Sequence, residues 1–387
     1  MSTPRIEINL KKIAHNAKTL NRLYGSKKID VIGVTKAVCG DPAVAAALVQ
    51  NGIRILADSR LINIRRMRRA GIKAEFLLLR TPFLSQAESV VKYADISLNS
   101  EISVIERLAK YAERQHTKHK IILMIELGDL REGIMPEDLD YTIKQVLELK
   151  SIELAGIGTN LACFGGIKPD EEKMNYLSSI AMNIEKKYGL TLKFVSGGNS
   201  ANYHWFMSVN DAGKINNLRL GESIYLGRET LHREAITGLY TDAFTLVAEV
   251  IESKLKPSLP YGEVAQDAFG NIPGFNDIGY INRAILGIGL QDVKVSGLTP
   301  KSDIEIIGAS SDHIIIDTKK TELKAGDEVE FDLNYAALLS AMTSPYVFKK
   351  VEVKLWMLKN IAKALNKNTA GIKKTFQPYL LKKTTLD

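Results

Sequence analysis

Two hydrophobic patterns follow one another along this chain of 387 residues. From about residue 30 to residue 227, short apolar runs alternate with longer segments whose apolar residues recur at helical spacing. The short runs predict eight strands, at 31–36, 53–58, 74–80, 94–98, 121–127, 154–160, 193–200 and 218–225. Helices are predicted between them, for instance at 41–51, 60–70, 100–116, 136–149 and 169–188.

Strands that alternate with helices form parallel βαβ units, and eight such units within roughly 200–250 residues are typical of a (β/α)8 TIM-type barrel. A doubly wound open sheet is the alternative α/β arrangement. It is disfavoured because no G-x-G-x-x-G sequence follows the first predicted strand. We therefore predict an α/β fold in which residues 1–231 form the barrel domain.

The pattern changes after Leu231, where helical periodicity gives way to strand-like runs separated by Gly and Pro. Strands predicted at 244–251, 284–288, 303–307, 313–317, 328–332 and 346–353 indicate a separate antiparallel β domain over residues 232–353. We expect the first apolar run, at 5–10, to join this β domain. Residues 354–387 follow as a basic extension, whose apolar residues at helical spacing predict a helix.

Composition restricts the class of protein. Apolar residues make up 45% and charged residues 25% of the chain, as in an ordinary globular protein. No stretch approaches the ~20 apolar residues of a membrane span, and the first residues lack an apolar signal core. The two cysteines, Cys39 and Cys163, suit neither a disulfide framework nor a metal site, so we expect a cytoplasmic protein.

The net charge of +8 comes from the C-terminal region alone. Ten lysines lie between Val347 and Asp387, against two acidic residues, so residues 1–346 are formally neutral. The main body therefore lacks the basic surface expected of a nucleic-acid-binding protein.

The most informative residue for chemistry is Lys36, at the end of the apolar run 31–36. Side chains at the C-terminal ends of strands line the functional face of a barrel. A lysine ammonium that is half-buried there has a lowered pKa, and its free amine can form a Schiff base. Lys36 is thus a candidate covalent residue, with a solvated surface lysine as the alternative.

The ends of the last three barrel strands supply small and polar residues. Asn160 ends the sixth strand, Asn199 and Ser200 follow the seventh, and the eighth carries Arg219. Loops after strands seven and eight form the usual phosphate site of such barrels, because glycines let backbone N–H groups approach and serine adds a donor. A Schiff-base lysine opposite a phosphate site suggests pyridoxal 5'-phosphate.

These motifs, taken in order, resemble the alanine racemase-like family of pyridoxal phosphate enzymes (fold type III), and most closely its ornithine racemase-like branch. The resemblance runs from about Arg5 to about Phe348 and begins with Ile-Glu-Ile-Asn-Leu at 6–10. Lys36 falls at the position of the family's cofactor lysine. The pair Asn199-Ser200 is similar to the family's Asn-Ser pair, whose serine binds the cofactor phosphate.

The run Arg-Leu-Gly-Glu at 219–222 is similar to the family's Arg-Pro-Gly sequence. The resemblance implies that Arg219 faces the pyridine nitrogen and that the backbone at Gly221 and Glu222 binds phosphate. An arginine there leaves the nitrogen unprotonated, which disfavours transamination and suits simple removal and return of a proton. Further expected contacts of the cofactor are Asn160, Asn199 and Tyr346.

Arg131 follows the fifth strand, where the family has an arginine that orients the second base or the substrate. Glu126 and Asp129 beside it can hold it in a network or recognise a cationic substrate side chain. A surface arginine in an acidic loop is the alternative interpretation.

The chain departs from alanine racemase at the second acid/base. That enzyme uses a tyrosine of its β domain, in a Gly-Tyr-Ala-Asp motif, and the matching run here, at 287–292, has Leu290 in the tyrosine position. Candidates from the same domain are Asp292, His313, Tyr280 and Tyr346. We expect Asp292 and His313 to be catalytic, His313 because the ordinary pKa of a histidine suits the task. The alternatives are a structural role for His313 and binding of a substrate ammonium by Asp292. No His/Cys pair indicates a metal site.

The resemblance implies an amino-acid racemase that interconverts L and D forms by removing and returning the Cα proton, with ornithine or another basic amino acid as preferred substrate. It also implies a homodimer whose active site is shared between subunits. The alternatives are alanine racemase itself, or a decarboxylase, D-hydroxy-amino-acid aldolase or dehydratase on the same scaffold. A non-catalytic cofactor carrier is disfavoured because such proteins resemble the barrel alone.

Overall fold

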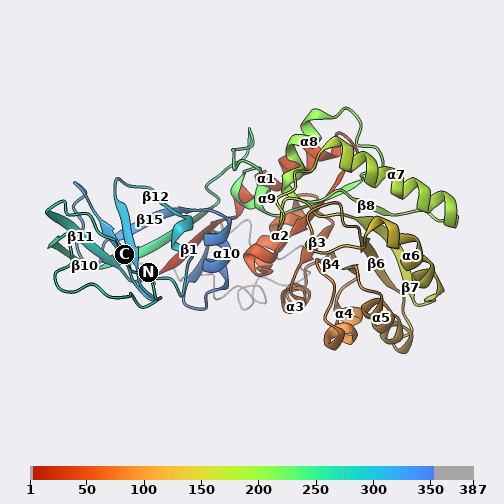
Figure 1. The fold of residues 1–387 in the computed structure, drawn as a ribbon, viewed down its shortest axis with the longest axis horizontal. Coiled ribbons are helices and arrows are strands. Elements are labelled where there is room, and N and C mark those ends of the chain that lie inside the picture. Colours follow the sequence, from red (N-terminus) through yellow and green to blue (C-terminus); the bar gives the residue numbers. More distant parts are fainter. Residues whose placement is uncertain (1–2, 273, 353–387) are drawn as a thin grey trace, which may run out of the picture. The chain divides into compact units, whose positions relative to one another are not determined.

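A computed structural model describes residues 3–272 and 274–352 of the chain, which divide into two compact units (Figure 1). The first unit is Leu10–Thr241, and the second contains residues 3–9 and 242–352. The basic extension predicted at 354–387 lies outside the described residues.

The first unit is a closed barrel of eight parallel strands, as predicted. The strands follow one another around the barrel in chain order. They are β2 (Asp30–Val34), β3 (Ile55–Asp58), β4 (Glu75–Leu78), β5 (Ile96–Asn99), β6 (His119–Met124), β7 (Ile152–Gly158), β8 (Phe194–Ser196) and β9 (Asn217–Leu220). β9 pairs with β2 and closes the barrel.

Helices connect these strands and surround the barrel (Figure 1). They are α1 (Leu10–Gly25), α2 (Pro42–Gln50), α3 (Leu61–Arg69), α4 (Ala87–Tyr93), α5 (Ile102–Arg114), α6 (Leu139–Glu148), α7 (Glu171–Tyr188), α8 (Tyr203–Ser208) and α9 (Glu222–Leu226). Side chains of alternate strand residues, among them Ile32, Val34, Leu77, Ile122 and Phe194, pack together into a core cluster. The functional end of the barrel is therefore a set of loops on a rigid support.

Six of the eight predicted barrel strands end two to five residues earlier than the apolar pattern suggests, among them the strand expected to end at Asn160. β2 ends at Val34, and Lys36 begins a short 3-10 helix, η1 (Lys36–Val38). β9 ends at Leu220, and the predicted strand residues 222–225 belong to α9. The residues that follow β2 and β9 are apolar because neighbouring elements bury them. A buried strand and a short buried helix therefore look alike in the sequence.

The second unit contains an antiparallel sheet in the order β12-β15-β10-β11-β14-β13, which confirms the predicted type of domain. Its strands are β10 (Phe244–Pro257), β11 (Tyr280–Leu286), β12 (Leu298–Pro300), β13 (Glu305–Ala309), β14 (Ile314–Asp317), β15 (Glu328–Leu333) and β16 (Phe348–Glu352). The first strand of the chain, β1 (Arg5–Asn9), pairs antiparallel with β10 and parallel with β16.

The prediction that helical structure ends after Leu231 is wrong, because α10 (Tyr335–Thr343) lies in the second unit. Asn334 caps this helix by accepting a hydrogen bond from Ala337 N, at 3.0 Å. The segment is apolar on most sides, so its helical periodicity is weak in the sequence. The short strand β12 was also not predicted.

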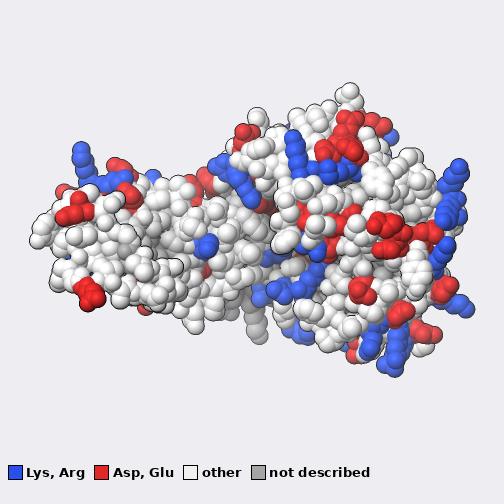
Figure 2. Space-filling model, in the orientation of Figure 1, with Lys and Arg blue, Asp and Glu red and all other residues white. Residues whose placement is uncertain are grey.

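The surface in Figure 2 carries Lys and Arg side chains interspersed with Asp and Glu, as the formal neutrality of residues 1–346 implies. Within the described residues, no helix is long and apolar enough to cross a membrane.

Candidate active site

Lys36 lies directly after β2, at the C-terminal end of the barrel. Burial lowers the pKa of its amine; the nearby Cys163 and Asp58 oppose this shift, and the cationic Arg131 and Arg219 reinforce it. These five residues come from five different loops or strand ends, so the barrel brings them within electrostatic range of one another. The predicted electrostatic character of Lys36 is therefore present in the structure.

A buried carboxylate fixes the backbone that leads to Lys36. Asp58, at the end of β3, is 0% exposed, and burial raises its pKa. Its Oδ2 accepts a hydrogen bond from Thr35 Oγ1 at 2.8 Å, and its Oδ1 accepts from Asn63 Nδ2 at 3.0 Å and Arg60 N at 2.8 Å. Sequence reasoning missed this role, although Asp58 was placed at the end of a predicted strand, where polar residues of a barrel are functional.

Arg219 is a buried cation in the wall of the barrel, only 4% exposed. Its guanidinium donates to Ser196 Oγ, to the Thr159 carbonyl at 2.7 Å and to Asn160 Oδ1 at 3.3 Å, all neutral oxygens. Burial lowers its pKa to about 10, since a charged guanidinium is poorly solvated there.

The loops after β8 and β9 meet at two serine hydroxyls. Ser200 Oγ and Ser223 Oγ are 3.1 Å apart, and Ser223 N donates to Ser200 Oγ at 3.3 Å. Asn199 turns the first of these loops, accepting from Ala201 N at 2.8 Å and donating to the Leu161 carbonyl at 2.8 Å. Gly198 precedes it at φ +138°, where a side chain would collide with Asn202 Oδ1 at 2.4 Å. The structure thus brings together the loops that were predicted to bind phosphate.

Glu222 begins α9, directly after Gly221, and forms an ion pair with Arg233. Burial raises the pKa of its carboxyl, while the Arg233 and Lys36 charges oppose the rise. The side chain of Glu222 is therefore engaged with another loop of the same unit, and only its backbone remains a candidate for phosphate binding.

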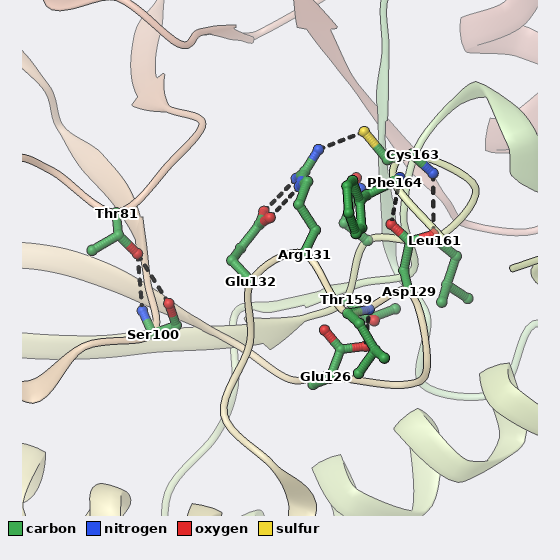
Figure 3. Close-up of polar contacts among 12 residues, drawn as sticks. Thr81, Ser100, Glu126, Asp129, Arg131, Glu132, Thr159, Leu161, Cys163 and Phe164 are labelled. Atoms are coloured by element: carbon green, nitrogen blue, oxygen red, sulfur yellow. Dashed lines mark hydrogen bonds and ion pairs between the residues drawn. The ribbon is translucent and has the colours of Figure 1, made fainter. Parts of the chain in front are cut away.

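Arg131 lies in the loop after β6, between two acceptors (Figure 3). Its Nη1 donates to Cys163 Sγ at 2.6 Å, and its Nε and Nη2 pair with the Glu132 carboxylate. Burial disfavours its charge, but the hydrogen bonds and charge of Glu132 outweigh burial and raise its pKa. Arg131 is thus a charged side chain that two neighbours hold in place, although the residue is exposed.

The two acidic residues suggested as partners of Arg131 have other roles. Glu126 Oε1 accepts from Gly128 N at 2.6 Å and Leu130 N at 3.0 Å. Asp129 is 0% exposed and accepts from three backbone amides of the loop after β7. Both carboxylates shape loops. Sequence reasoning missed both residues that hold Arg131. Glu132 is its neighbour in the chain, whereas Cys163 lies on the loop after β7, a contact that only the fold creates.

The remaining predicted residues belong to the second unit. Asp292 is 4% exposed and accepts a hydrogen bond from Ser344 Oγ at 2.8 Å. His313 Nδ1 lies 3.0 Å from Asp312 Oδ1. Tyr280 and Tyr346 are largely exposed, at 70% and 69%, and Leu290 is 39% exposed. Their catalytic or cofactor roles remain predictions.

The barrel residues suit pyridoxal 5'-phosphate on three counts. Lys36 offers an amine of lowered pKa to an aldehyde, and Ser200 and Ser223 offer hydroxyls to a phosphate. Next to Arg219, the buried Thr159 Oγ1 and Asn160 Nδ2 lack a hydrogen-bond partner within the described part of the chain. Such orphaned polar atoms around a buried cation are expected where a polar ligand completes the site.

Comparisons with known proteins agree with this arrangement. The family profile "Alanine racemase, N-terminal domain" matches residues 8–229. The chain is 41% identical over 352 residues to the ornithine racemase of Acetoanaerobium sticklandii, covering 90% of this chain and 99% of that protein. It is 40% identical over 354 residues to the lysine racemase of Thermotoga maritima, covering 91% and 99% respectively.

The fold agrees with solved structures as well. Alanine racemase from D-cycloserine-producing Streptomyces lavendulae superimposes with a TM-score of 0.72 at 14% identity, over 92% of this chain and 99% of that one. This likeness confirms the predicted fold of a TIM-type barrel with an antiparallel β domain. With sequence similarity over nearly the full length of two racemases, the chain belongs to the alanine racemase-like family and is an amino-acid racemase.

Proposed function

We propose that this chain is a pyridoxal 5'-phosphate-dependent racemase of basic amino acids, ornithine or lysine. The observation that carries the proposal is Lys36, whose amine has a lowered pKa at the end of the barrel where the loops of Ser200 and Ser223 meet. The substrate class is supported by the similarity to an ornithine and a lysine racemase over about nine-tenths of the chain.

Lys36 would hold the aldehyde group of the cofactor, and Ser200, Ser223 and the backbone at Gly221 and Glu222 would bind its phosphate. When bound, the cofactor supplies an electron-withdrawing ring that stabilises negative charge on the substrate Cα. The lowered pKa of Lys36 increases the share of neutral amine at neutral pH, so that its Nζ can accept the Cα proton on one face.

Arg219 would donate to the ring nitrogen of the cofactor. A guanidinium is a donor at any working pH and cannot supply a proton readily, so it keeps that nitrogen unprotonated. Negative charge then stays closer to Cα, which favours return of the proton there. The buried position of Arg219 excludes water from this interaction.

Arg131 would bind the substrate carboxylate, since a planar guanidinium matches a carboxylate with two parallel hydrogen bonds. The second acid/base would come from the β domain of a partner subunit, with Asp292 and His313 as candidates. This part of the proposal requires a homodimer, in which the two sites are related by symmetry.

The test is incubation of the purified protein with pyridoxal phosphate and, separately, with L-ornithine, L-lysine and L-alanine, followed by chiral chromatography. We expect D-ornithine or D-lysine to form faster than D-alanine. Faster formation of D-alanine would contradict the substrate class. Release of a decarboxylated amine, or release of glycine in a parallel incubation with D-threonine, without racemisation would replace the proposal with a decarboxylase or an aldolase.

A separate measurement tests the cofactor. After borohydride treatment of the protein with pyridoxal phosphate, peptide mass spectrometry should find the cofactor on Lys36. Lys36→Ala should abolish this adduct, whereas Lys320→Ala, which removes an exposed lysine of the other unit, should leave it in place. An adduct spread over several surface lysines would contradict the assignment.

A further inference from the structure

The loops after β6 and β7 of the barrel are joined by a single buried carboxylate. Asp129, from the first loop, accepts hydrogen bonds from Cys163 N at 3.2 Å, Phe164 N at 2.9 Å and Ile167 N at 3.4 Å. Its own carbonyl accepts from Gly165 N at 3.1 Å. The side chain is 0% exposed, so these contacts replace water completely.

The backbone segments at this junction approach so closely that two positions have no room for a side chain. A Cβ on Gly165 would lie 2.7 Å from the Asp129 carbonyl oxygen, and one on Gly133 would lie 2.4 Å from Glu126 N. Glycine is therefore required on both sides of the junction. Leu130, next to Asp129, adopts a left-handed φ of +52°, and Glu126 stabilises this turn by accepting from Leu130 N.

The junction sets the position of one side chain on each loop. It carries Cys163 to 2.6 Å from Arg131 Nη1, while Glu132 holds the other edge of the guanidinium (Figure 3). Cys163 is also within electrostatic range of Lys36. The thiol therefore lies at the functional end of the barrel and contacts the arginine assigned to the substrate carboxylate.

We propose that Asp129 and Cys163 are positioning residues of the racemase: Asp129 fastens the two loops together, and Cys163 Sγ holds Arg131 in the orientation that receives the substrate carboxylate. The proposal rests on the proposed function for the role of Arg131. A hydrogen bond to a charged group that selects one rotamer of a long side chain lowers the entropy cost of substrate binding.

Kinetics of Cys163→Ala, Cys163→Ser and Asp129→Asn with L-ornithine form the first arm of the test. We expect Cys163→Ala to raise KM about tenfold, as for loss of one hydrogen bond to a charged group. kcat should fall much less, since the carboxylate is bound before and during proton transfer. Serine, which keeps an acceptor at that position, should restore part of the loss.

The matched control is Asp170→Asn. Asp170 also caps a backbone amide, accepting from Lys173 N at 2.9 Å at the start of α7, but it has no part in the junction. If the loss of any carboxylate that caps a backbone amide raised KM, Asp129→Asn and Asp170→Asn would raise it equally. Asp129→Asn should raise KM and Asp170→Asn should not; in the double variant with Cys163→Ala, Asp129→Asn should add little, because both act through Arg131.

The second arm does not need racemase activity. The rate at which iodoacetamide alkylates Cys163 is followed by peptide mass spectrometry, before and after pyridoxal phosphate is added. Because Arg131 Nη1 lies 2.6 Å from Cys163 Sγ and Asp129 holds the Cys163 amide, Arg131→Ala and Asp129→Asn should both change the alkylation rate several-fold, and Asp170→Asn should not.

The two arms of the test distinguish failure of the proposed function from failure of the proposed positioning role. If the wild type racemises no amino acid, the proposed function is overturned, and the alkylation rates decide whether the contact exists. If Arg131→Ala leaves alkylation of Cys163 unchanged, or if Cys163→Ala leaves KM unchanged in an active racemase, the positioning role is overturned.

Discussion

At the scale of single residues, the proposed chemistry depends on charged side chains that the fold removes from water. Lys36 loses affinity for its proton because it is half-buried near two arginines. Arg219 is buried against neutral oxygens, and its pKa falls to about 10. In water these side chains would have the ordinary pKa values of lysine and arginine. The buried environment shifts these pKa values, as is common at functional sites.

Arg219→Glu tests the residue assigned to the ring nitrogen. A carboxylate there favours a protonated nitrogen, so we expect racemisation to slow and formation of the keto acid by transamination to increase relative to it. Both products are measured on the same reaction by chromatography. Arg219→Lys keeps a cation and serves as control. Equal ratios of keto acid to D-amino acid in the glutamate variant and the wild type would mean that Arg219 does not contact the nitrogen.

His119 gives a prediction for stability against pH. Burial lowers its pKa from 6.5 to about 4, and its Nε2 lies 2.8 Å from Ser97 Oγ. Between these pH values only the unfolded chain binds the proton, so stability is lost as pH falls from 6.5 towards 4, by at most on the order of 3 kcal/mol.

Urea unfolding of wild type and His119→Gln at pH 7.5 and pH 5 measures this contribution. The wild type should lose more stability between the two pH values than the variant, because glutamine does not titrate. His116→Gln, which changes an exposed histidine nearby, should behave like the wild type. Parallel losses in wild type and His119→Gln would show that His119 titrates normally.

At the scale of elements, close packing of strands decides which residues the barrel tolerates. Gly156 in β7 pairs with Phe194 in β8, and a Cβ there would lie 2.2 Å from the Phe194 carbonyl oxygen. The backbone cannot make room for this Cβ without moving β8, the strand that leads to the loop of Ser200. Stability and site geometry are therefore coupled at this position.

Gly156→Ala should destabilise the protein by about 1–3 kcal/mol, as overpacking of a core does. It should also weaken binding of pyridoxal phosphate, measured by titration of absorbance, because β8 leads to Asn199 and Ser200. Gly308→Ala in β13 is the control, since no atom lies within 4 Å of its added Cβ. A midpoint of thermal unfolding equal to that of the control would contradict the close approach of β7 and β8.

At the scale of the whole molecule, the proposed mechanism takes its two acid/base groups from different units. The barrel supplies Lys36, and Leu290 stands where the alanine racemase-like pattern has tyrosine. The candidates Asp292, His313, Tyr280 and Tyr346 all belong to the unit that contains the β sheet. In a homodimer, each site would draw its second group from the partner.

Substitution of each of the four candidates tests this division of labour. Removal of the true second acid/base should slow racemisation by on the order of 10²–10⁴-fold. Exchange of the Cα proton with deuterated solvent should continue from the Lys36 side for one enantiomer, as followed by NMR. Intact inversion in Asp292→Asn, His313→Gln, Tyr280→Phe and Tyr346→Phe would place the second base in the barrel or assign both faces to Lys36.

The sequence by itself determined the barrel, the antiparallel domain and the order of the site motifs. Periodicity reports burial of local segments, so eight alternating strand and helix patterns suffice to indicate a (β/α)8 barrel. Lys36, Ser200 and Arg219 could be named because strand ends in such a barrel share one face. The helix α9 at the end of the eighth predicted strand and the helix α10 could not be predicted, because buried apolar residues give the same pattern in short helices and in strands.

Only the tertiary structure decided the contacts between distant segments. Asp58 beneath Thr35, Asp129 capping the loop of Cys163, and Cys163 against Arg131 join residues that are about 20 to 40 positions apart in the chain. No local pattern encodes these pairs, because each side chain satisfies its partner only after the barrel has closed. The acidic neighbours Glu126 and Asp129, which adjacency suggested for Arg131, turned out to bind backbone amides for the same reason.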